Sequence, residues 1–333
     1  MLQHEFRVCV VGAGAIGGVL AAMLARAGCA VSVVARGAHL QAIKQNGLQL
    51  TSTAGLRNFT AQVEATDDPS RLGLQDIVMI ALKAHDVPGI AAKMQPLVGD
   101  TTIVVPILNG IPWWYFHGLR GISHAQPIAC LDPAGDAARH IPMQAIIGCV
   151  ARIAATVTAP GVVRHTHGNR FILGEPSCEM SDRLRRLATV LQGAGFDAVA
   201  TTRIRDEIWT KLQGNLATNP LSALTRASLG DLCESPALVS LMRRVMQECM
   251  AVGEAWGISF TSDLETSLVR FRSLGDSKPS MLQDVEKGRP MEIASIVQAP
   301  IELARHAGIA TPTLDAILAL ISERARHLEQ EHA

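Results

Sequence analysis

The chain has 333 residues, of which 30 are basic and 30 acidic, so its formal net charge at pH 7 is zero. This balance gives no electrostatic reason to expect a nucleic-acid or anionic-membrane partner. The length suffices for two domains with separate cores, and the seven cysteines form no CxxC pair, which favours reduced thiols and a cytoplasmic location.

The first predicted strand, residues 7–11, leads through a glycine-rich turn into an apolar helix, and a second β-rich run covers 30–35. Strand, glycine turn, helix and strand within about 30 residues is the context of a dinucleotide-binding site. Glycines let the backbone approach a pyrophosphate, which the helix N-terminus stabilises. The uncharged run 8–25 could also suit a signal peptide or a membrane span, but its glycine spacing argues against both. The predicted cofactor loop is Gly12, Ala13, Gly14, Ala15, Ile16 and Gly17.

The second strand ends at Arg36. In an NAD site this position usually carries an acid that accepts hydrogen bonds from the ribose 2′-hydroxyl. An arginine instead suits a 2′-phosphate, which it grips through charge-assisted hydrogen bonds. The sequence therefore predicts NADP in preference to NAD.

Two further apolar runs, 77–82 and 102–108, are typical of strands buried on both faces. Lys83 and Asn109 follow them directly. Because ligands bind at the carboxyl ends of parallel strands, we expect Lys83 to meet a phosphate or ribose and Asn109 the nicotinamide side. By the same rule, the residues expected at this one edge are Gly12, Arg36, Lys83 and Asn109.

The remaining pattern changes from mixed to helical near residue 200. Strand-like runs at 145–151, 162–164 and 196–200 and a helix at 181–193 precede the change. His165 and His167 have no cysteine or carboxylate cluster beside them, so no metal site is expected. Helices are then predicted at 204–219, 236–256, 261–274, 278–287, 291–307 and 312–329.

These patterns predict an α/β protein, with an N-terminal Rossmann-type doubly wound sheet followed by an all-α C-terminal domain. We expect an NADP-binding domain at 1–200 and a helical substrate-binding and catalytic domain at 201–333. The apolar helical domain makes a homodimer plausible, and nothing in the sequence indicates a membrane partner.

A polar strip is expected on the helix that begins near residue 204. Lys211, Asn215 and Asn219 fall close to one face and alternate with leucines, which favours a cleft-facing strip over a solvated surface. Ser280 opens a later helix, and Glu292 opens another after a Gly-Arg-Pro break. Singly, each of these two reads more readily as a helix cap than as a ligand; with Lys211 they gain weight as site residues.

Together these motifs resemble the ketopantoate reductases (2-dehydropantoate 2-reductases) over essentially the whole chain. The matching residues are the glycine loop at 12–17, Arg36, Lys83, Asn109-Gly110, residues 161–165, Lys211 with Asn215 and Asn219-Pro220, Ser280 with Asp284, and Gly288-Arg289 with Glu292. The resemblance implies that Lys211 is the proton donor and that Arg36 and Lys83 contact NADP. It also implies a catalytic and cofactor-side role for Glu292, a cofactor- and substrate-side role for Asn109, and substrate binding by Asn215, Asn219 and Ser280.

The implied reaction is NADPH-dependent reduction of a 2-oxo acid to a 2-hydroxy acid, in the first instance 2-dehydropantoate to pantoate in pantothenate biosynthesis. Lys211 would stabilise the developing oxyanion and protonate it. The family commonly has an acid and an Asn-Gly pair where this chain has Ala294, Val297 and Gln298, so a different 2-oxo acid stays open. A non-catalytic NADP-binding regulator is a third reading. The aromatic segment 113–116 suits core packing or a larger apolar pocket.

Overall fold

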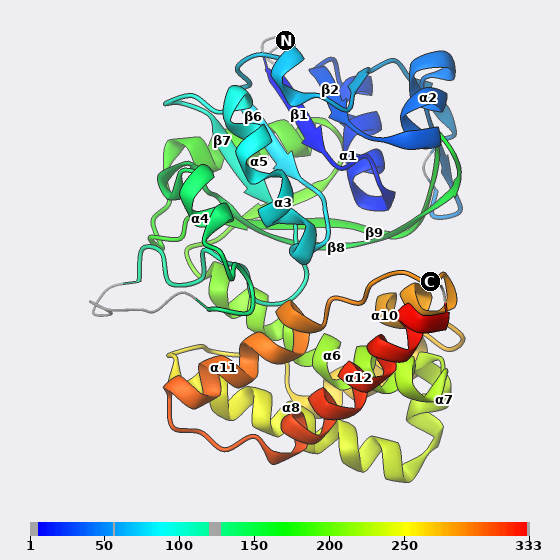
Figure 1. Cartoon of the computed structure of the whole chain (residues 1–333), viewed down its shortest axis with the longest axis vertical. Helices are drawn as coiled ribbons and strands as arrows, with labels where there is room; N and C mark the ends of the chain where they lie inside the picture. Colours follow the sequence, from blue (N-terminus) through cyan, green and yellow to red (C-terminus); the bar gives the residue numbers. More distant parts are fainter. Residues whose placement is uncertain (1–5, 56, 120–127, 332–333) are drawn as a thin grey trace. The chain divides into compact units, whose positions relative to one another are not determined.

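The computed structural model describes residues 6–55, 57–119 and 128–331, which form two compact units (Figure 1). The first unit holds the described residues up to 108 together with 113–119 and 132–204. The second unit holds 109–112, 128–131 and 205–331. The helical unit therefore includes two short segments from the first half of the chain, which the predicted division at residue 200 does not anticipate.

The first unit is built on a parallel five-stranded sheet with the order β5-β2-β1-β6-β7. The strand order reverses beside β1, because the chain builds outward to β5 and then returns to the other side of β1 for β6 and β7. This reversal is the topological switch of a doubly wound sheet, so the predicted fold class is confirmed. The strands are β1 (Arg7–Val11), β2 (Ala30–Val34), β5 (Glu64–Thr66), β6 (Ile77–Ile80) and β7 (Ile103–Pro106).

A second sheet in the same unit has the order β10-β9-β3-β4, and β8 pairs with β9 in a long antiparallel hairpin. The strands near 148 and 162 run well past their predicted ends. Beyond Ala151 in β8, and between Thr166 and Arg170 in β9, no residue is buried, so these stretches form no apolar run. The strands are β3 (Leu48–Ser52), β4 (Phe59–Ala61), β8 (Gly148–Ala159), β9 (Val162–Gly174) and β10 (Asp197–Ala200).

Helix α1 (Ala15–Arg26) packs against strands of both sheets and is buried from Gly17 to Leu24. A helix covered on all sides must be apolar all round, which explains the uncharged run at 8–25. Within the described ranges, no helix is long and apolar enough to span a bilayer. The other helices of this unit are α2 (Gly37–Asn46), η1 (Pro69–Arg71), η2 (Ala84–Asp86), α3 (Val87–Ala91), η3 (Ala92–Leu97), α4 (Asp136–His140), η4 (Met143–Ala145) and α5 (Asp182–Gly193).

The second unit is helical, as predicted. Helix α6 (Ile204–Thr225) continues through Pro220, where one helical hydrogen bond is lost but the neighbouring side chains are buried. Helix α7 is an addition to the predicted set, and it begins with a capping box in which Ser228 and Asp231 each bond the other's backbone N–H. The remaining helices are α7 (Leu229–Glu234), α8 (Pro236–Ala255), α9 (Leu264–Ser273), α10 (Ser280–Glu286), the π-helical turn η5 (Ala294–Gln298), α11 (Ala299–His306) and α12 (Pro312–Glu331).

Candidate active site

Three polar side chains from distant parts of the sequence meet in the second unit. The Lys211 Nζ donates to the Asn109 Oδ1 at 2.8 Å, and the Asn109 Nδ2 donates to the Glu292 Oε2 at 3.1 Å. The side-chain amide of Asn109 thus bridges a lysine and a carboxylate, using its acceptor toward the first and a donor toward the second. The structure therefore brings together three residues whose participation the sequence predicted. Asn109 belongs to the helical unit, although it was expected to serve the nicotinamide side of the sheet edge.

Helix α6 is almost entirely buried around Lys211. From residue 208 to 223 every position is buried except Lys211 and Asn215, which are half-buried and one helical turn apart. These two side chains therefore share the accessible stripe of the helix. One turn further on, Asn219 is only 3% exposed, and its Nδ2 lies 3.4 Å from the Oγ of Ser280.

Glu292 is 8% exposed and lies just before the π-helical turn η5. The Gly-Arg-Pro segment that precedes it is fixed by Arg289, whose backbone N–H bonds the Asp284 carbonyl and whose guanidinium lies 2.9 Å from the Asp284 carboxylate. A buried carboxylate needs hydrogen-bond donors, and the Asn109 amide supplies one.

The glycine loop of the first unit fits a bound pyrophosphate. Gly12 has a φ of 98°, which favours glycine, and a Cβ added at Gly17 would overlap the Gly12 carbonyl oxygen. Beside Gly14 a Cβ would meet no atom within 4 Å, so the approach to the backbone is open there. Gly14 is also the N-cap of α1 and makes no side-chain capping bond, which leaves the first N–H groups of the helix available to an anion.

His39 is a residue of this loop region that the sequence reasoning missed. Its Nδ1 accepts the Gly161 N–H at 2.9 Å, so in the neutral ring Nε2 carries the proton and donates to the Ala13 carbonyl at 2.7 Å. The ring thereby ties the glycine loop to the turn between β8 and β9. A single histidine in the first turn of a helix carries no spacing signal by which sequence reasoning could have found it.

Arg36 and Lys83 follow strands β2 and β6 at the edge that carries Gly12. Arg36 is exposed and forms the N-cap of α2 without a side-chain capping bond, and Lys83 is half-buried at the start of η2. The guanidinium of Arg36 is thus presented at the carboxyl end of β2, where an adenosine ribose lies in dinucleotide folds. The placement of both residues agrees with the predicted cofactor edge, whereas their contact with NADP remains a prediction.

The aromatic segment after Gly110 contributes two side chains to the core. Trp114 is 2% exposed and Tyr115 is fully buried, both within the first unit. Gly148 is needed beside the Trp114 ring, because a Cβ there would lie 2.6 Å from the ring. Core packing therefore accounts for Trp114 and Tyr115, whereas Trp113 and Phe116 are half-buried.

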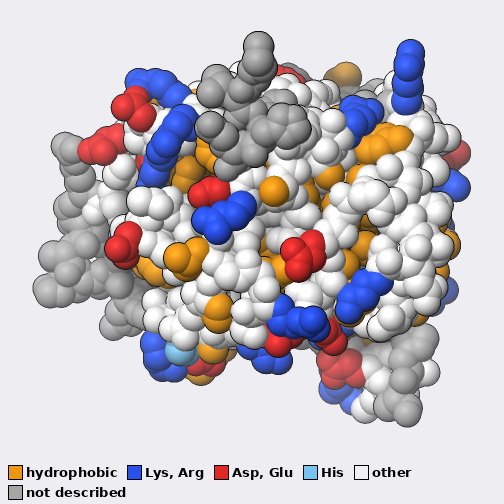
Figure 2. All heavy atoms as spheres, turned by 90° about the horizontal axis from the view of Figure 1, so that it is seen from above, with side chains coloured by type: hydrophobic (Ala, Val, Ile, Leu, Met, Phe, Trp, Pro, Cys, Tyr) orange, Lys and Arg blue, Asp and Glu red, His pale blue; other side chains and the backbone are white. Residues whose placement is uncertain are grey.

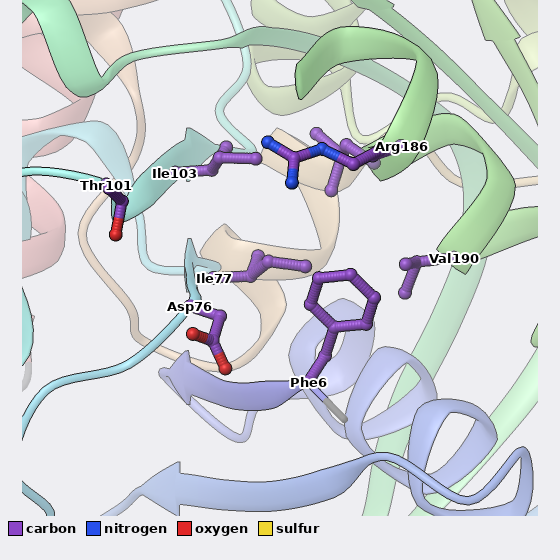
Figure 3. Close-up of a pocket in the computed structure, with 8 residues that line it drawn as sticks. Phe6, Asp76, Ile77, Thr101, Ile103, Arg186 and Val190 are labelled. Atoms are coloured by element: carbon purple, nitrogen blue, oxygen red, sulfur yellow. The ribbon is translucent and has the colours of Figure 1, made fainter. Parts of the chain in front are cut away.

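A hollow of about 300 Å³ lies elsewhere in the first unit (Figure 3). It is lined by residues that include Asp76 and Ile77 at the amino end of β6 and Arg186 on α5, so it lies at the sheet edge opposite Gly12. It contains no predicted site residue. Among the described residues no group of three or more histidine, cysteine or carboxylate side chains is arranged to hold a metal.

Figure 2 shows basic and acidic side chains interspersed with apolar ones over one face of the molecule, in keeping with the zero net charge. A mixed surface of this kind attracts neither a polyanion nor a polycation strongly.

Two protein-family models match the chain. One, described as ketopantoate reductase PanE/ApbA, covers residues 8–177, and the other, its C-terminal counterpart, covers 203–325. The chain is 45% identical over 320 residues to a 2-dehydropantoate 2-reductase of Mesorhizobium japonicum, covering 96% of this chain and 98% of the relative.

Solved structures of ketopantoate reductases are also similar to the chain. A protein of Ralstonia solanacearum MolK2, provisionally described as a ketopantoate reductase, is 39% identical with a TM-score of 0.91, over 97% of this chain and 98% of that one. A 2-dehydropantoate 2-reductase of Geobacter metallireducens GS-15 is 30% identical with a TM-score of 0.84, over 96% and 99%. A D-mandelate dehydrogenase solved with NADH and anilino(oxo)acetate shares the fold, at 22% identity and a TM-score of 0.82 over 97% and 99%.

Proposed function

Since the chain belongs to the ketopantoate reductase (PanE/ApbA) family of oxidoreductases, we propose that it reduces 2-dehydropantoate to pantoate with NADPH. The observation that carries this proposal is the Lys211–Asn109–Glu292 cluster, with Asn215 beside Lys211 on the same helix face. A cationic donor held beside a carboxylate on a nearly buried helix suits protonation of an oxyanion.

The cofactor assignment rests on the first unit. The glycine loop and the uncapped start of α1 suit the pyrophosphate, and Arg36 in place of an acid supports a 2′-phosphate. NADPH, when bound, supplies a hydride to the substrate carbonyl carbon. Lys83 at the same edge would add a second positive charge for the phosphate or ribose groups.

Lys211 would act on the carbonyl oxygen. Negative charge develops there as the carbonyl is reduced, and an ammonium within hydrogen-bond distance both stabilises the charge and supplies the proton. Asn109 holds the Lys211 Nζ through its own oxygen, which fixes where the ammonium group lies. Glu292 would accept a hydrogen bond from a substrate hydroxyl and keep a compensating charge near the lysine.

The other polar residues would hold the substrate carboxylate. Ser280 is exposed at the start of α10 and has the amide of Asn219 within 3.4 Å, so a hydroxyl and an amide are available side by side. Asn215 adds an amide on the accessible stripe of α6. Three neutral donors of this kind bind a carboxylate without neutralising Lys211.

A second candidate is reduction of a different 2-oxo acid with the same residues. It is favoured by the departures from the family pattern after Glu292, since Ala294 stands where the family commonly has an acid, and Val297 and exposed Gln298 stand where it commonly has Asn-Gly. Val297 is fully buried and is therefore part of the core.

The test is a panel of 2-oxo acids assayed by the loss of NADPH absorbance. The proposal expects 2-dehydropantoate to give the highest kcat/KM and NADPH to be preferred over NADH. A higher kcat/KM for another 2-oxo acid would establish the second candidate. Tight NADPH binding without turnover on any of them would identify a non-catalytic NADP-binding protein and refute both.

A further inference from the structure

We infer that Gly110, the Ser295 carbonyl and Pro300 form a backbone clamp that holds Asn109 between Lys211 and Glu292. The clamp is made of the loop 109–111 and the π-helical turn η5, all within the second unit. Its members act through Asn109 and are therefore positioning residues. Their catalytic consequence rests on the proposed function.

Pro300 explains why the Ser295 carbonyl does not take part in the π-helical hydrogen-bond pattern. In a π-helical turn a carbonyl accepts from the N–H five residues ahead, as the Ala294 carbonyl does from Ala299. The residue five ahead of Ser295 is Pro300, which has no N–H to donate. The backbone N–H of Ile111 takes that place and donates to the Ser295 carbonyl at 2.9 Å.

Gly110 is what allows the two backbones to meet. Its φ is 80°, a conformation that favours glycine, and a Cβ added there would overlap the Ser295 carbonyl oxygen and carbon. The next residue, Ile111, is fully buried, so the loop is anchored by its side chain as well as by its N–H. Any side chain at 110 must therefore separate the loop from η5.

The clamp sets the position of the Asn109 amide relative to its partners. Glu292 and Ser295 lie about one helical turn apart on one continuous stretch of backbone, so holding Ile111 to Ser295 also holds Asn109 to Glu292. The amide then reaches the Lys211 Nζ on α6. Misplacement of a positioning group by about 1 Å can cost on the order of 10²-fold in rate.

The functional test is a double-mutant cycle of Gly110→Ala with Asn109→Ala. We expect Gly110→Ala to lower kcat by roughly 10- to 100-fold in the wild-type background, with the KM for NADPH nearly unchanged. In the Asn109→Ala background the same change should lower kcat by less than about 3-fold, because the group it positions is gone. Equal losses in both backgrounds would show a general structural effect and overturn the inference. Gly89→Ala is the matched control, because a Cβ there meets no atom within 4 Å.

The structural test needs no turnover and so separates this inference from the proposed function. In the wild type the Ile111 amide should be protected from hydrogen exchange, and Gly110→Ala should abolish that protection. If Gly110→Ala does not fold, Pro300→Ala serves, since it restores an N–H that competes for the Ser295 carbonyl. It should speed exchange at Ile111 several-fold, whereas Pro236→Ala, at the start of α8, should not. Unchanged protection of Ile111 in the variant tested would overturn the clamp.

Discussion

The two units build their candidate sites from different materials. The first unit offers backbone: a tight glycine turn and the free N–H groups of α1. The second offers side chains, gathered from positions 102 and 183 residues apart in the sequence. A backbone site is encoded within a few consecutive residues and tolerates few substitutions there. A side-chain site depends on long-range packing, so changes far from it in sequence can still move it.

The largest effect is expected from breaking the side-chain site alone. Lys211→Ala should lower kcat by roughly 10²- to 10⁴-fold, because it removes the group that we propose to stabilise and protonate the oxyanion. NADPH binding, measured by quenching of its fluorescence, should persist. Lys93→Ala, at an exposed position of the first unit, is the control. Near-normal turnover of Lys211→Ala would remove Lys211 from the reaction.

The next largest effect is expected from distorting the glycine loop of the first unit. Gly17→Ala should weaken NADPH binding by at least about 10-fold, because its Cβ would overlap the Gly12 carbonyl and push the loop out of shape. Titration of NADPH by calorimetry measures the affinity, with thermal unfolding as a check on folding. An affinity within error of the wild type would contradict the assignment of this loop.

A smaller effect is expected from a change that alters the preference for NADPH over NADH and leaves the glycine loop intact. Arg36→Ala should raise the KM for NADPH by about 10-fold and leave that for NADH nearly unchanged, because only NADPH carries the 2′-phosphate. The measurement is the ratio of kcat/KM for the two cofactors. An equal change in kcat/KM for NADPH and NADH would show that Arg36 does not bind the 2′-phosphate.

The smallest effect concerns stability and should leave both sites intact. Ser228→Ala removes one half of the capping box of α7 and should cost about 1 kcal/mol in the free energy of unfolding, with unchanged kcat. Hydrogen bonds from the Ser228 backbone and hydroxyl hold the pKa of Asp231 below its usual value. A carboxyl with a lowered folded pKa adds stability above its unfolded pKa and loses it as the pH falls through the folded value. The cost of Ser228→Ala should therefore shrink in acid; urea titrations at neutral and acid pH test this.

The same contrast explains what the sequence could predict. The buried strands β1 and β6 and the glycine loop are local patterns, and the structure has them where they were expected. Strands β3 and β4 are short and partly exposed, so they carry no comparable apolar run and were missed.

In the candidate site, too, the features set by local sequence were predictable and those set by long-range contacts were not. The polar face of α6 follows from helical spacing and was visible in advance. The docking of Asn109 into the helical unit was not, because it depends on the contact between Gly110 and η5, for which one sequence offers no signal.

The Asn109-Gly110 pair also has a consequence for chemical ageing. An asparagine before glycine is prone to deamidation, in which the glycine backbone nitrogen attacks the side-chain amide. Here that amide is held away by its bonds to Lys211 and Glu292, so the folded protein should protect it. Once converted to aspartate, residue 109 could no longer donate to Glu292 and would place a second carboxylate beside it. Deamidation of Asn109 should therefore be slower in the folded protein than in the urea-unfolded chain at the same pH and temperature, as peptide mass spectrometry would reveal, and equal rates would contradict this protection.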